Sequence, residues 1–207
     1  MATPLGGTAL KRLKCGFFIV CLYPVWRWFY LAWTDNLTAN PPEFLIRSSG
    51  VWCLVLLFLS LSITPLRHLT GQSALIRLRR MAGLFSLFYG LLHTVAWSLW
   101  EQDLSLLLMW QDLIQRPFVT VGAVALLFML LLGITSTHGW MRRLGRNWQR
   151  LHRLVYLAAI LALLHFYLMR LGKNNFLDVW IYSAVLAVLF GMRIWWRWQR
   201  HASAQRE

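Results

Sequence analysis

The sequence is short of acidic residues and of charge in general. Only seven of its 207 residues are Asp or Glu, against 21 Lys and Arg, and charged residues of both signs make up 14% of the chain. Soluble proteins carry about 25% charged residues, so this composition excludes an ordinary soluble domain. The net charge of +14 would suit a nucleic-acid-binding protein. Because the basic residues form short clusters between long apolar runs, however, nucleic acid is excluded as a partner.

Cysteine is also scarce, and the three in the chain are Cys15, Cys21 and Cys53. None of them forms a CxxC or other metal-ligand spacing, so the sequence predicts no disulfide framework and no cysteine-bound metal. We expect all three to be small buried apolar side chains. The sequence also shows no internal repeat, no low-complexity stretch and no loop long enough to fold alone. A catalytic module would therefore be a separate partner chain.

What the chain has in excess is apolar surface. Hydrophobic residues make up 58% of it, against about 45–50% in soluble domains, and 13 residues are Trp, which favours membrane–water interfaces. Because about 20 apolar residues span a bilayer as a helix, we expect six membrane-spanning helices. They cover residues 13–33, 51–66, 81–100, 118–135, 151–171 and 176–196. The predicted fold class is all-α, an integral membrane six-helix bundle that forms a single domain over residues 1–207.

The basic residues predict the orientation of these helices. Sixteen of the 21 fall on one side of the predicted membrane, and six of the seven acidic residues fall on the other. Loops rich in Lys and Arg stay in the cytoplasm, so both termini are expected there. Lys11, Arg12 and Lys14 precede the first apolar run as in a signal peptide, but no small-residue cleavage site follows. We therefore expect the first helix to be retained.

Two histidines inside predicted helices are the strongest candidates for a functional site. His93 is 12 residues beyond Met81 and His165 is 14 residues beyond Leu151, so both are expected roughly 18–21 Å from the inner face of the membrane. Two imidazoles at one depth on two helices can bind a haem iron from both sides. Hydrogen bonding to a neighbouring helix, proton transfer and binding of another metal are the alternatives.

A third histidine, His152, could belong to a second haem site, because it would lie about 20 Å below His165 on an ideal helix. The separation corresponds to about 3.6 turns, however, so the two side chains would not share a face. The third helix offers no inner histidine to pair with His152, which leaves His68 or His138 to complete such a site. These two and His201 fall in basic loops, where we expect them to face solvent or lipid headgroups.

Four segments resemble a known family of membrane proteins. The longest is TSTHGWMRRLGRNWQRLHRLVYLAAILALLH at 135–165, and the others are ITPLR at 63–67, LIRLRRMAGL at 75–84 with His93 following, and RPFVTVG at 116–122. Together they resemble the MsrQ family (also called YedZ), the haem-binding membrane subunits of periplasmic methionine sulfoxide reductase systems. That family belongs to the ferric-reductase-like transmembrane group, which includes the membrane part of NADPH oxidases.

The resemblance implies b-type haem held between helices. Many relatives carry two histidines on each of two helices, and this chain, like the family, lacks one of them on the third helix. One haem is therefore expected, or two if His152 finds a partner. FMN is also implied as a cofactor. The implied electron path runs from the quinone pool, or from a cytoplasmic flavin reductase, to the periplasmic molybdenum-cofactor reductase subunit MsrP. The implied assembly is a heterodimer with MsrP at the bacterial inner membrane.

Three arginines ahead of the third helix, Arg77, Arg79 and Arg80, could bind haem propionates or a flavin phosphate, because guanidinium suits both anions. Contact with lipid headgroups is the alternative for them. Three functions are therefore weighed: a haem b electron-transfer subunit, an autonomous transmembrane ferric or quinone reductase, and a non-redox transporter or assembly protein. The second should carry or recruit an NADPH/FAD domain, which the sequence does not show. The third would often show inverted repeats and broken helices, which the sequence does not show either.

Overall fold

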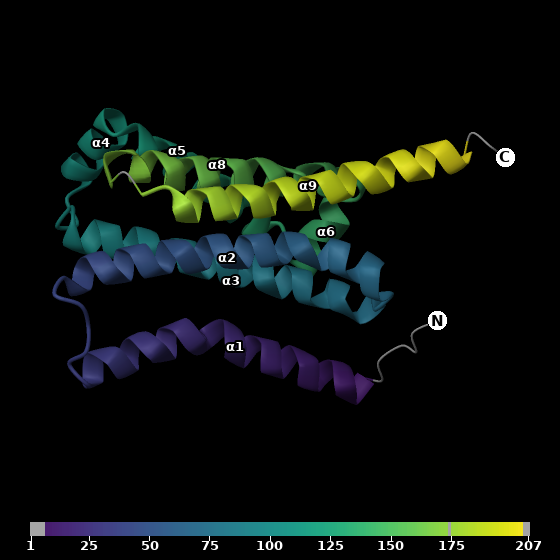
Figure 1. Cartoon of the computed structure of the whole chain (residues 1–207), viewed down its shortest axis with the longest axis horizontal. Helices are drawn as coiled ribbons and strands as arrows, with labels where there is room; N and C mark the ends of the chain where they lie inside the picture. Colours follow the sequence, from purple (N-terminus) through teal and green to yellow (C-terminus); the bar gives the residue numbers. More distant parts are fainter. Residues whose placement is uncertain (1–6, 174, 205–207) are drawn as a thin grey trace.

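The computed structural model of the chain describes residues 7–173 and 175–204. Every regular element in these ranges is a helix, and six helical segments are long and apolar enough to cross a membrane. They are built on α1 (Gly7–Trp33), α2 (Pro41–Thr70), α3 (Ile76–Trp100), α5 (Pro117–Ile134), α8 (Leu154–Arg170) and α9 (Leu177–Ala204) (Figure 1). The predicted all-α fold with six membrane-spanning helices is confirmed.

The second helix is longer than predicted, because α2 begins at Pro41 rather than at Val51. Asn40 caps it: the Asn40 side chain accepts a hydrogen bond from the Glu43 backbone N–H at 3.3 Å. Proline fits the first turn of a helix, where no backbone donor is needed. Apolar runs mark only the part of a helix that lies in lipid. The first turns of α2, in which Glu43 and Arg47 form an ion pair at 3.0 Å, therefore fell outside the prediction.

The third helix also begins earlier, at Ile76 instead of residue 81. Gly71 follows the end of α2 with a φ of 69°, a left-handed conformation that glycine adopts without strain. A short 3-10 helix, η1 (Ser73–Leu75), then leads into α3. The three arginines expected in the connecting loop, at positions 77, 79 and 80, therefore lie in the first two turns of α3.

Three short helices were not predicted from the sequence: α4 (Leu106–Gln115), α6 (His138–Leu144) and α7 (Arg146–Leu151). α4 is amphipathic. Leu106 and Trp110 are 82% and 61% exposed, whereas Asp112 is buried and accepts a hydrogen bond from the Gln102 amide at 3.0 Å. An amphipathic helix of this kind suits the membrane–water interface.

The long helices other than α1 and α9 form two antiparallel pairs. α2 packs chiefly on α3, and α5 packs chiefly on α8. The main apolar core lies between these elements and α9. Its buried members include Leu57 and Leu61 of α2, Met129 of α5, Ala159 of α8 and Leu186 of α9. The two pairs thus share one core, and each pair presents one face to the other.

The helix α1 lies at the edge of the bundle and bends near Pro24 (Figure 1), because proline removes one helical hydrogen bond. Its contact with α3 centres on Tyr89, which is 0% exposed and donates its hydroxyl proton to the Cys21 carbonyl at 2.7 Å. The Trp28 ring meets the Tyr89 ring edge-on, with centroids 5.8 Å apart. Much of the remaining α1 surface is apolar and exposed, as expected of a helix in contact with lipid.

The three cysteines are free, but they do not share one environment. Cys21 is buried at the contact between α1 and α3, and Cys53 is half-buried in α2. Cys15 is exposed on α1, so the expectation that all three are buried was wrong for this residue. Cys15 lies on the outward side of α1, whereas its neighbours Leu13 and Phe17 pack inwards, which sequence hydrophobicity alone does not reveal.

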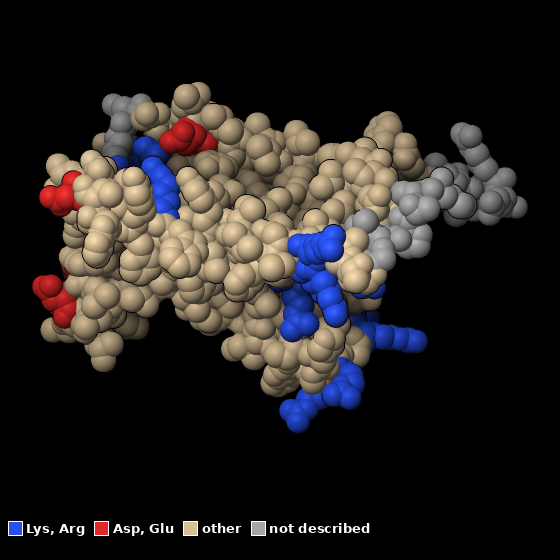
Figure 2. Space-filling view, turned by 90° about the horizontal axis from the view of Figure 1, so that it is seen from below, with Lys and Arg blue, Asp and Glu red and all other residues tan. Residues whose placement is uncertain are grey.

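The two ends of the bundle differ in charge (Figure 2). The six acidic residues that the structure describes lie at the end that carries the connections after α1, α3 and α8, which we call the acidic end. Most Lys and Arg residues lie at the opposite, basic end, where α1 begins and α9 ends (Figure 1). Because α1 begins and α9 ends at the same end of the bundle, the chain crosses it an even number of times. The compartment that each end faces stays a prediction.

Replacing Tyr89 with Phe is expected to loosen α1. The change keeps the ring and removes only the hydroxyl that bonds the Cys21 carbonyl, so we expect a loss of about 1 kcal/mol of stability. Thermal unfolding of the detergent-solubilised protein measures it. Tyr23→Phe, at an exposed tyrosine of α1, is the matched control. Equal unfolding temperatures for the two variants would show that this hydrogen bond does not hold α1 in place.

Candidate functional site

His93 on α3 and His165 on α8 face each other between the two helix pairs. Their ring centroids are 6.0 Å apart, and the ring planes are inclined by 80°. His93 lies seven residues before Trp100, at the end of α3, and His165 lies five residues before Arg170, at the end of α8. Both are therefore about 8–11 Å from the acidic ends of their helices. The structure thus brings together the two histidines whose depths match in the sequence.

Each of these histidines is tied to a backbone carbonyl of the paired helix. Nδ1 of His93 donates to the Ile46 carbonyl on α2 at 2.8 Å, and Nδ1 of His165 donates to the Phe118 carbonyl on α5 at 2.6 Å. A carbonyl oxygen only accepts, so the proton of each neutral ring sits on Nδ1 and the lone pair sits on Nε2. Neither Nε2 atom has a hydrogen-bond partner in the part of the chain that the structure describes.

Each ring also lies directly against a glycine of the paired helix. A methyl group added at Gly50 would come within 3.1 Å of Nδ1 of His93. At Gly122 the same addition would come within 2.7 Å of Nδ1 of His165. At Gly122 this approach is closer than real side-chain contacts come, and at Gly50 the ring would have to shift by a few tenths of an ångström. The absence of a side chain at both positions therefore leaves room for the two imidazoles beside the helix backbone.

The spacing of the two rings fits a metal ion between them. A metal–imidazole bond is about 2 Å long, so two facing nitrogens on one metal lie about 4 Å apart and their ring centres about 6 Å apart. The observed 6.0 Å between centroids meets this requirement. Two neutral imidazoles are the donor set of a bis-histidine haem, because each fills one axial position of the iron. The alternative is that both histidines only form structural hydrogen bonds. This explains the contacts of Nδ1 in each ring, but it gives Nε2 no role.

His152 lies elsewhere, at the junction between α7 and α8. Its ring stacks on Trp148, with centroids 3.9 Å apart, and its Nε2 lies 3.4 Å from Ser136 Oγ. The α-helix is interrupted here, because α7 ends at Leu151 and α8 begins only at Leu154, with a turn of three-residue hydrogen bonds between them. The expected angle between His152 and His165, which assumed a continuous helix, therefore does not apply.

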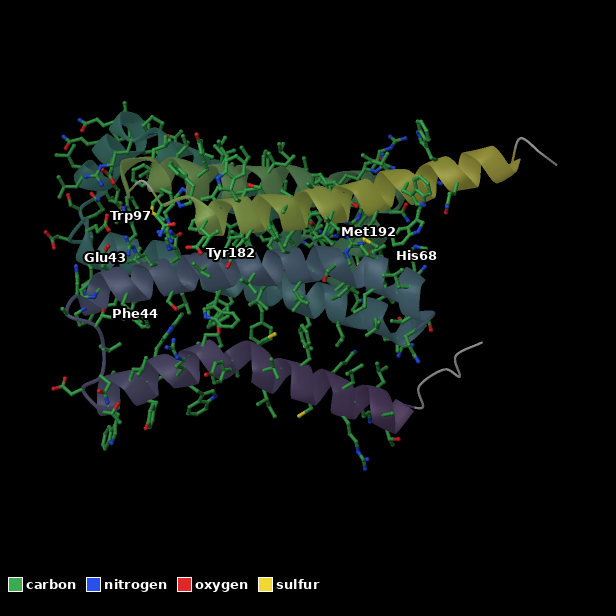
Figure 3. The ribbon with its side chains drawn as sticks, in the orientation of Figure 1. Glu43, Phe44, His68, Trp97, Tyr182 and Met192 are labelled. Carbon is green, nitrogen blue, oxygen red and sulfur yellow. The ribbon has the colours of Figure 1, made fainter. Side chains whose placement is uncertain are left out.

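No second pair of facing histidines appears among the described residues. His68 packs instead against Trp196, with ring centroids 4.8 Å apart, and lies towards the basic end (Figure 3). His138 is exposed in the first turn of α6. The side chain of His201 lies outside the described residues. The structure therefore places neither His68 nor His138 opposite His152.

Of the three arginines considered in the sequence, only Arg79 turns into the bundle. Arg79 is half-buried and donates from Nη1 to Thr64 Oγ1 at 3.5 Å, whereas Arg77 and Arg80 are exposed. Arg79 precedes His93 by 14 residues on α3, about 21 Å along the helix axis. Arg79 therefore lies towards the opposite end of α3 from His93.

Sequence reasoning missed Arg193 on α9. Its guanidinium donates to the Leu61 carbonyl at 2.5 Å and lies 5.2 Å over the Tyr156 ring. Arg79 interacts electrostatically with both Arg193 and His152, and none of the three has an acidic partner within the described ranges. The signal was available, since position 193 falls inside the last predicted membrane span, where an ionisable residue is costly.

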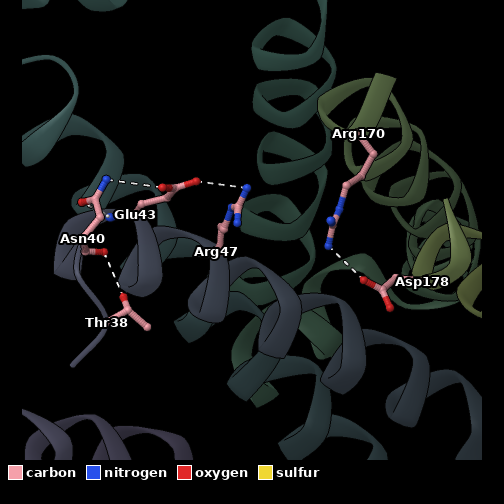
Figure 4. A network of polar contacts seen from close by, with 6 residues as sticks. All are labelled: Thr38, Asn40, Glu43, Arg47, Arg170 and Asp178. Carbon is pink, nitrogen blue, oxygen red and sulfur yellow. Dashed lines mark hydrogen bonds and ion pairs between the residues drawn. The ribbon is translucent and has the colours of Figure 1, made fainter. Parts of the chain in front are cut away.

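Three arginines at the acidic end, in contrast, are ion-paired. The pairs are Glu43–Arg47 at 3.0 Å, Asp112–Arg116 at 2.9 Å and Arg170–Asp178 at 2.9 Å (Figure 4 shows the first and the last). Arg170 differs from the other two, because its Nε is buried and has no hydrogen-bond partner among the residues described. It follows His165 by five residues, about 8 Å along α8.

The carboxylates of the acidic end are close enough to influence one another. Burial raises the pKa of the Glu101 carboxyl above its ordinary value; nearby Arg116 opposes this shift, and the negative charges of Asp112 and Glu43 add to it. Glu101 directly follows α3, the helix that carries His93. The end of the bundle nearest the histidine pair therefore holds acidic side chains of which three are in ion pairs.

A comparison with known protein families supports this reading of the bundle. A family model described as the ferric reductase like transmembrane component matches residues 49–163, more than half of the chain. The matched segment contains Gly50, His93, Gly122 and His152 and ends two residues before His165. No solved structure matches the chain. The helical bundle and its facing histidines thus define a membrane component of the ferric-reductase-like class.

Individual relatives narrow this class. The protein-methionine-sulfoxide reductase heme-binding subunit MsrQ of Bordetella pertussis is 52% identical, over 95% of this chain and 96% of its own length. MsrQ of Ralstonia nicotianae is 47% identical over 92% and 88% of the two chains, and MsrQ of Polaromonas naphthalenivorans is 44% identical over 88% and 84%. Identity at this level over nearly the full length shows that the chain belongs to the MsrQ family.

Proposed function

We propose that the chain is a haem b electron-transfer subunit that passes electrons through the membrane to an enzyme reducing methionine sulfoxide in oxidised periplasmic proteins. The observation that carries this proposal is the pair His93 and His165, with ring centres 6.0 Å apart and one nitrogen of each ring free. The printed names of the MsrQ relatives describe a heme-binding subunit of a protein-methionine-sulfoxide reductase, which supports the same function.

His93 and His165 would bind the iron through Nε2, one from α3 and one from α8. The hydrogen bonds from Nδ1 to Ile46 and Phe118 hold both rings in place and raise the donor strength of both ligands. When bound, the haem supplies a one-electron carrier. The apolar bundle around the two rings excludes water and sets the potential of that carrier together with the two carbonyl contacts.

The geometry supports one haem b rather than two. His152 would be the ligand of a second haem, but its ring is stacked on Trp148 and lies near Ser136. No other histidine faces it within the described part of the chain. A second haem would need a ligand from outside this set, so one haem per chain is the proposed content.

Arg170 is the proposed partner of a haem propionate. It lies about 8 Å from His165 along α8, and its buried Nε lacks a hydrogen-bond acceptor among the described residues. A guanidinium can bind Asp178 and a second carboxylate at the same time, because it carries five N–H donors. This assignment places the propionate contact at the acidic end rather than at positions 77, 79 and 80.

The cluster of Arg79, Arg193 and His152 is the proposed site of a second anionic group near the basic end. It gathers two guanidinium groups and an imidazole from three helical segments without an acidic partner in the described residues. A phosphate supplies the missing negative charge, and guanidinium binds phosphate well. FMN, which the likeness to the family implies, carries such a phosphate. Arg77 and Arg80 are exposed and suit lipid headgroups instead.

The charge of the two ends supports the proposed orientation. The basic end faces the cytoplasm and the acidic end faces the periplasm, in a chain embedded in the bacterial inner membrane. Electrons enter from the quinone pool or from a cytoplasmic flavin reductase. The partner is the molybdenum-cofactor subunit MsrP, which docks at the acidic end. The histidine pair lies near that end, so the electron travels a shorter distance from the haem to MsrP than from the cytoplasmic side to the haem.

Replacing either His93 or His165 with Ala is expected to abolish the b-type reduced-minus-oxidised spectrum of the purified protein, because each supplies one axial ligand. His138→Ala, at an exposed histidine, is the control and should keep the spectrum. Haem counted per chain by pyridine haemochromogen should be about one in the unaltered protein. A normal spectrum in both the His93 and the His165 variants would refute the site.

Replacing Arg170 with Gln is expected to lower the haem midpoint potential, because removing a nearby cation favours the ferric, more positive form. Arg47→Gln is the control, since Arg47 also lies at the acidic end in an ion pair but is more exposed. Potentiometric titration followed at the haem absorbance measures the shift. Equal potentials in the two variants would remove Arg170 from the propionate contact.

Replacing Arg79 with Gln is expected to lower the amount of flavin that co-purifies with the protein, because it removes one of the two inward-facing guanidinium groups. Arg77→Gln and Arg80→Gln are the controls, since both side chains are exposed. Flavin fluorescence after denaturation measures the content. If all three variants lost flavin equally, general basic charge rather than this cluster would be responsible.

A further inference from the structure

The surroundings of His93 and His165 repeat between the two helix pairs. In the α2–α3 pair the carbonyl, the glycine and the histidine are at 46, 50 and 93; in the α5–α8 pair they are at 118, 122 and 165. Each member of the second set follows its counterpart by 72 residues, and each carbonyl is 47 residues from its histidine. The two residues before each histidine repeat as well, since Leu-Leu-His stands at 91–93 and again at 163–165.

The position of the glycine follows from helix geometry. In an α-helix the carbonyl of a residue accepts the N–H of the residue four positions later. The Cα–Cβ bond of that later residue tilts back towards the helix N-terminus, over the same carbonyl. Gly50 is four residues after Ile46, and Gly122 is four residues after Phe118. A side chain at either glycine would cover the carbonyl oxygen that the imidazole reaches.

We infer that Gly50 and Gly122 are positioning residues for the two haem ligands, an inference that rests on the proposed haem function. They leave open the one approach by which each Nδ1–H can reach a helix carbonyl from the side. The carbonyl then fixes the rotation of the ring and keeps Nε2 directed at the iron position. The glycines touch neither iron nor substrate and act through the histidines alone.

The two glycines are expected to differ in their effect. An added methyl group at Gly122 would lie 2.7 Å from Nδ1 and 3.0 Å from Cε1 of His165, so the ring must move. At Gly50 the corresponding distances to His93 are 3.1 Å and 3.2 Å, which a shift of a few tenths of an ångström relieves. The ring cannot retreat and also keep its hydrogen bond, because the methyl group and the carbonyl lie on the same side.

Two properties of a bound haem would report a displaced histidine ring, and neither depends on the stability of the fold. A lost Nδ1–H···O bond makes the imidazole a weaker donor, which favours the ferrous form and raises the midpoint potential. A rotated ring changes the angle between the two ligand planes, which is 80° in the structure. Nearly perpendicular planes give a highly anisotropic low-spin ferric signal in electron paramagnetic resonance, and more parallel planes give a rhombic one.

The experiment compares Gly122→Ala and Gly50→Ala with two control variants in the full-length, detergent-purified protein. The controls are Gly191→Ala, where an added methyl group meets nothing within 4 Å, and Gly83→Ala, where it makes an ordinary contact of 3.5 Å with Ser60 Oγ. All four changes replace a helical glycine by alanine, so they share the same effect on helix propensity. The paramagnetic resonance spectrum, the midpoint potential and the haem affinity are measured for each.

We expect the haem affinity to fall about 10-fold in Gly50→Ala and up to about 100-fold in Gly122→Ala, with a raised potential and a more rhombic signal in both. The controls should match the unaltered protein. If Gly122→Ala does not fold, the milder Gly50→Ala decides the matter. Unchanged potential, signal and affinity in the glycine variants would overturn the inference, while loss of haem in His93→Ala and His165→Ala would still uphold the haem function. If the unaltered protein contained no haem, both the haem function and the role of the two glycines would be refuted.

Discussion

The hydrogen bond from an imidazole N–H to a helix carbonyl is the interaction on which this site depends. Inside a bilayer a polar N–H must find a partner within the protein, and the second lone pair of a helix carbonyl is an available acceptor. By using Nδ1 in this way, His93 and His165 leave the opposite nitrogen of each ring without a hydrogen bond, in rings whose centroids are 6.0 Å apart. The pairing of α2 with α3 and of α5 with α8 serves this contact, because the carbonyl and the histidine of each half come from paired helices.

The fold and the two central residues could be predicted from the sequence, whereas their support could not. Apolar runs of membrane length have few alternatives to a spanning helix, and the fixed rise of a helix matched the depths of His93 and His165. The role of Gly50 and Gly122 depends on how each helix is rotated against its partner, which no local pattern records. The sequence could not show that Arg79 points into the bundle while Arg77 and Arg80 do not, because the prediction placed all three in a loop before residue 81. The short helix α4, with ten residues, was too brief to register as a membrane element.

The distribution of charge divides the molecule into two halves that differ in how their arginines are held. At the acidic end arginines are held in ion pairs, so their charge is locally balanced and their geometry is fixed. Towards the basic end, Arg79 and Arg193 bond only to a hydroxyl, carbonyls and an aromatic ring within the described residues. An autonomous reductase would need a nucleotide domain as well. A transporter would be expected to break its helices near the middle of the membrane, but here the break between α7 and α8 lies close to the basic end.

The interruption at His152 and Arg153 separates the rotational phase of α8 from everything that precedes it. A helix transmits a change of one residue as a rotation of about 100° along its whole length, and a break absorbs that rotation. Changes of length in the segment of α6 and α7 can therefore leave the direction of His165 untouched. A single insertion between Leu154 and His165 would instead swing the imidazole away from His93. The same constraint holds on α3, where an insertion between Ile76 and His93 would rotate the other imidazole, so the site constrains the length of both helices that carry its histidines.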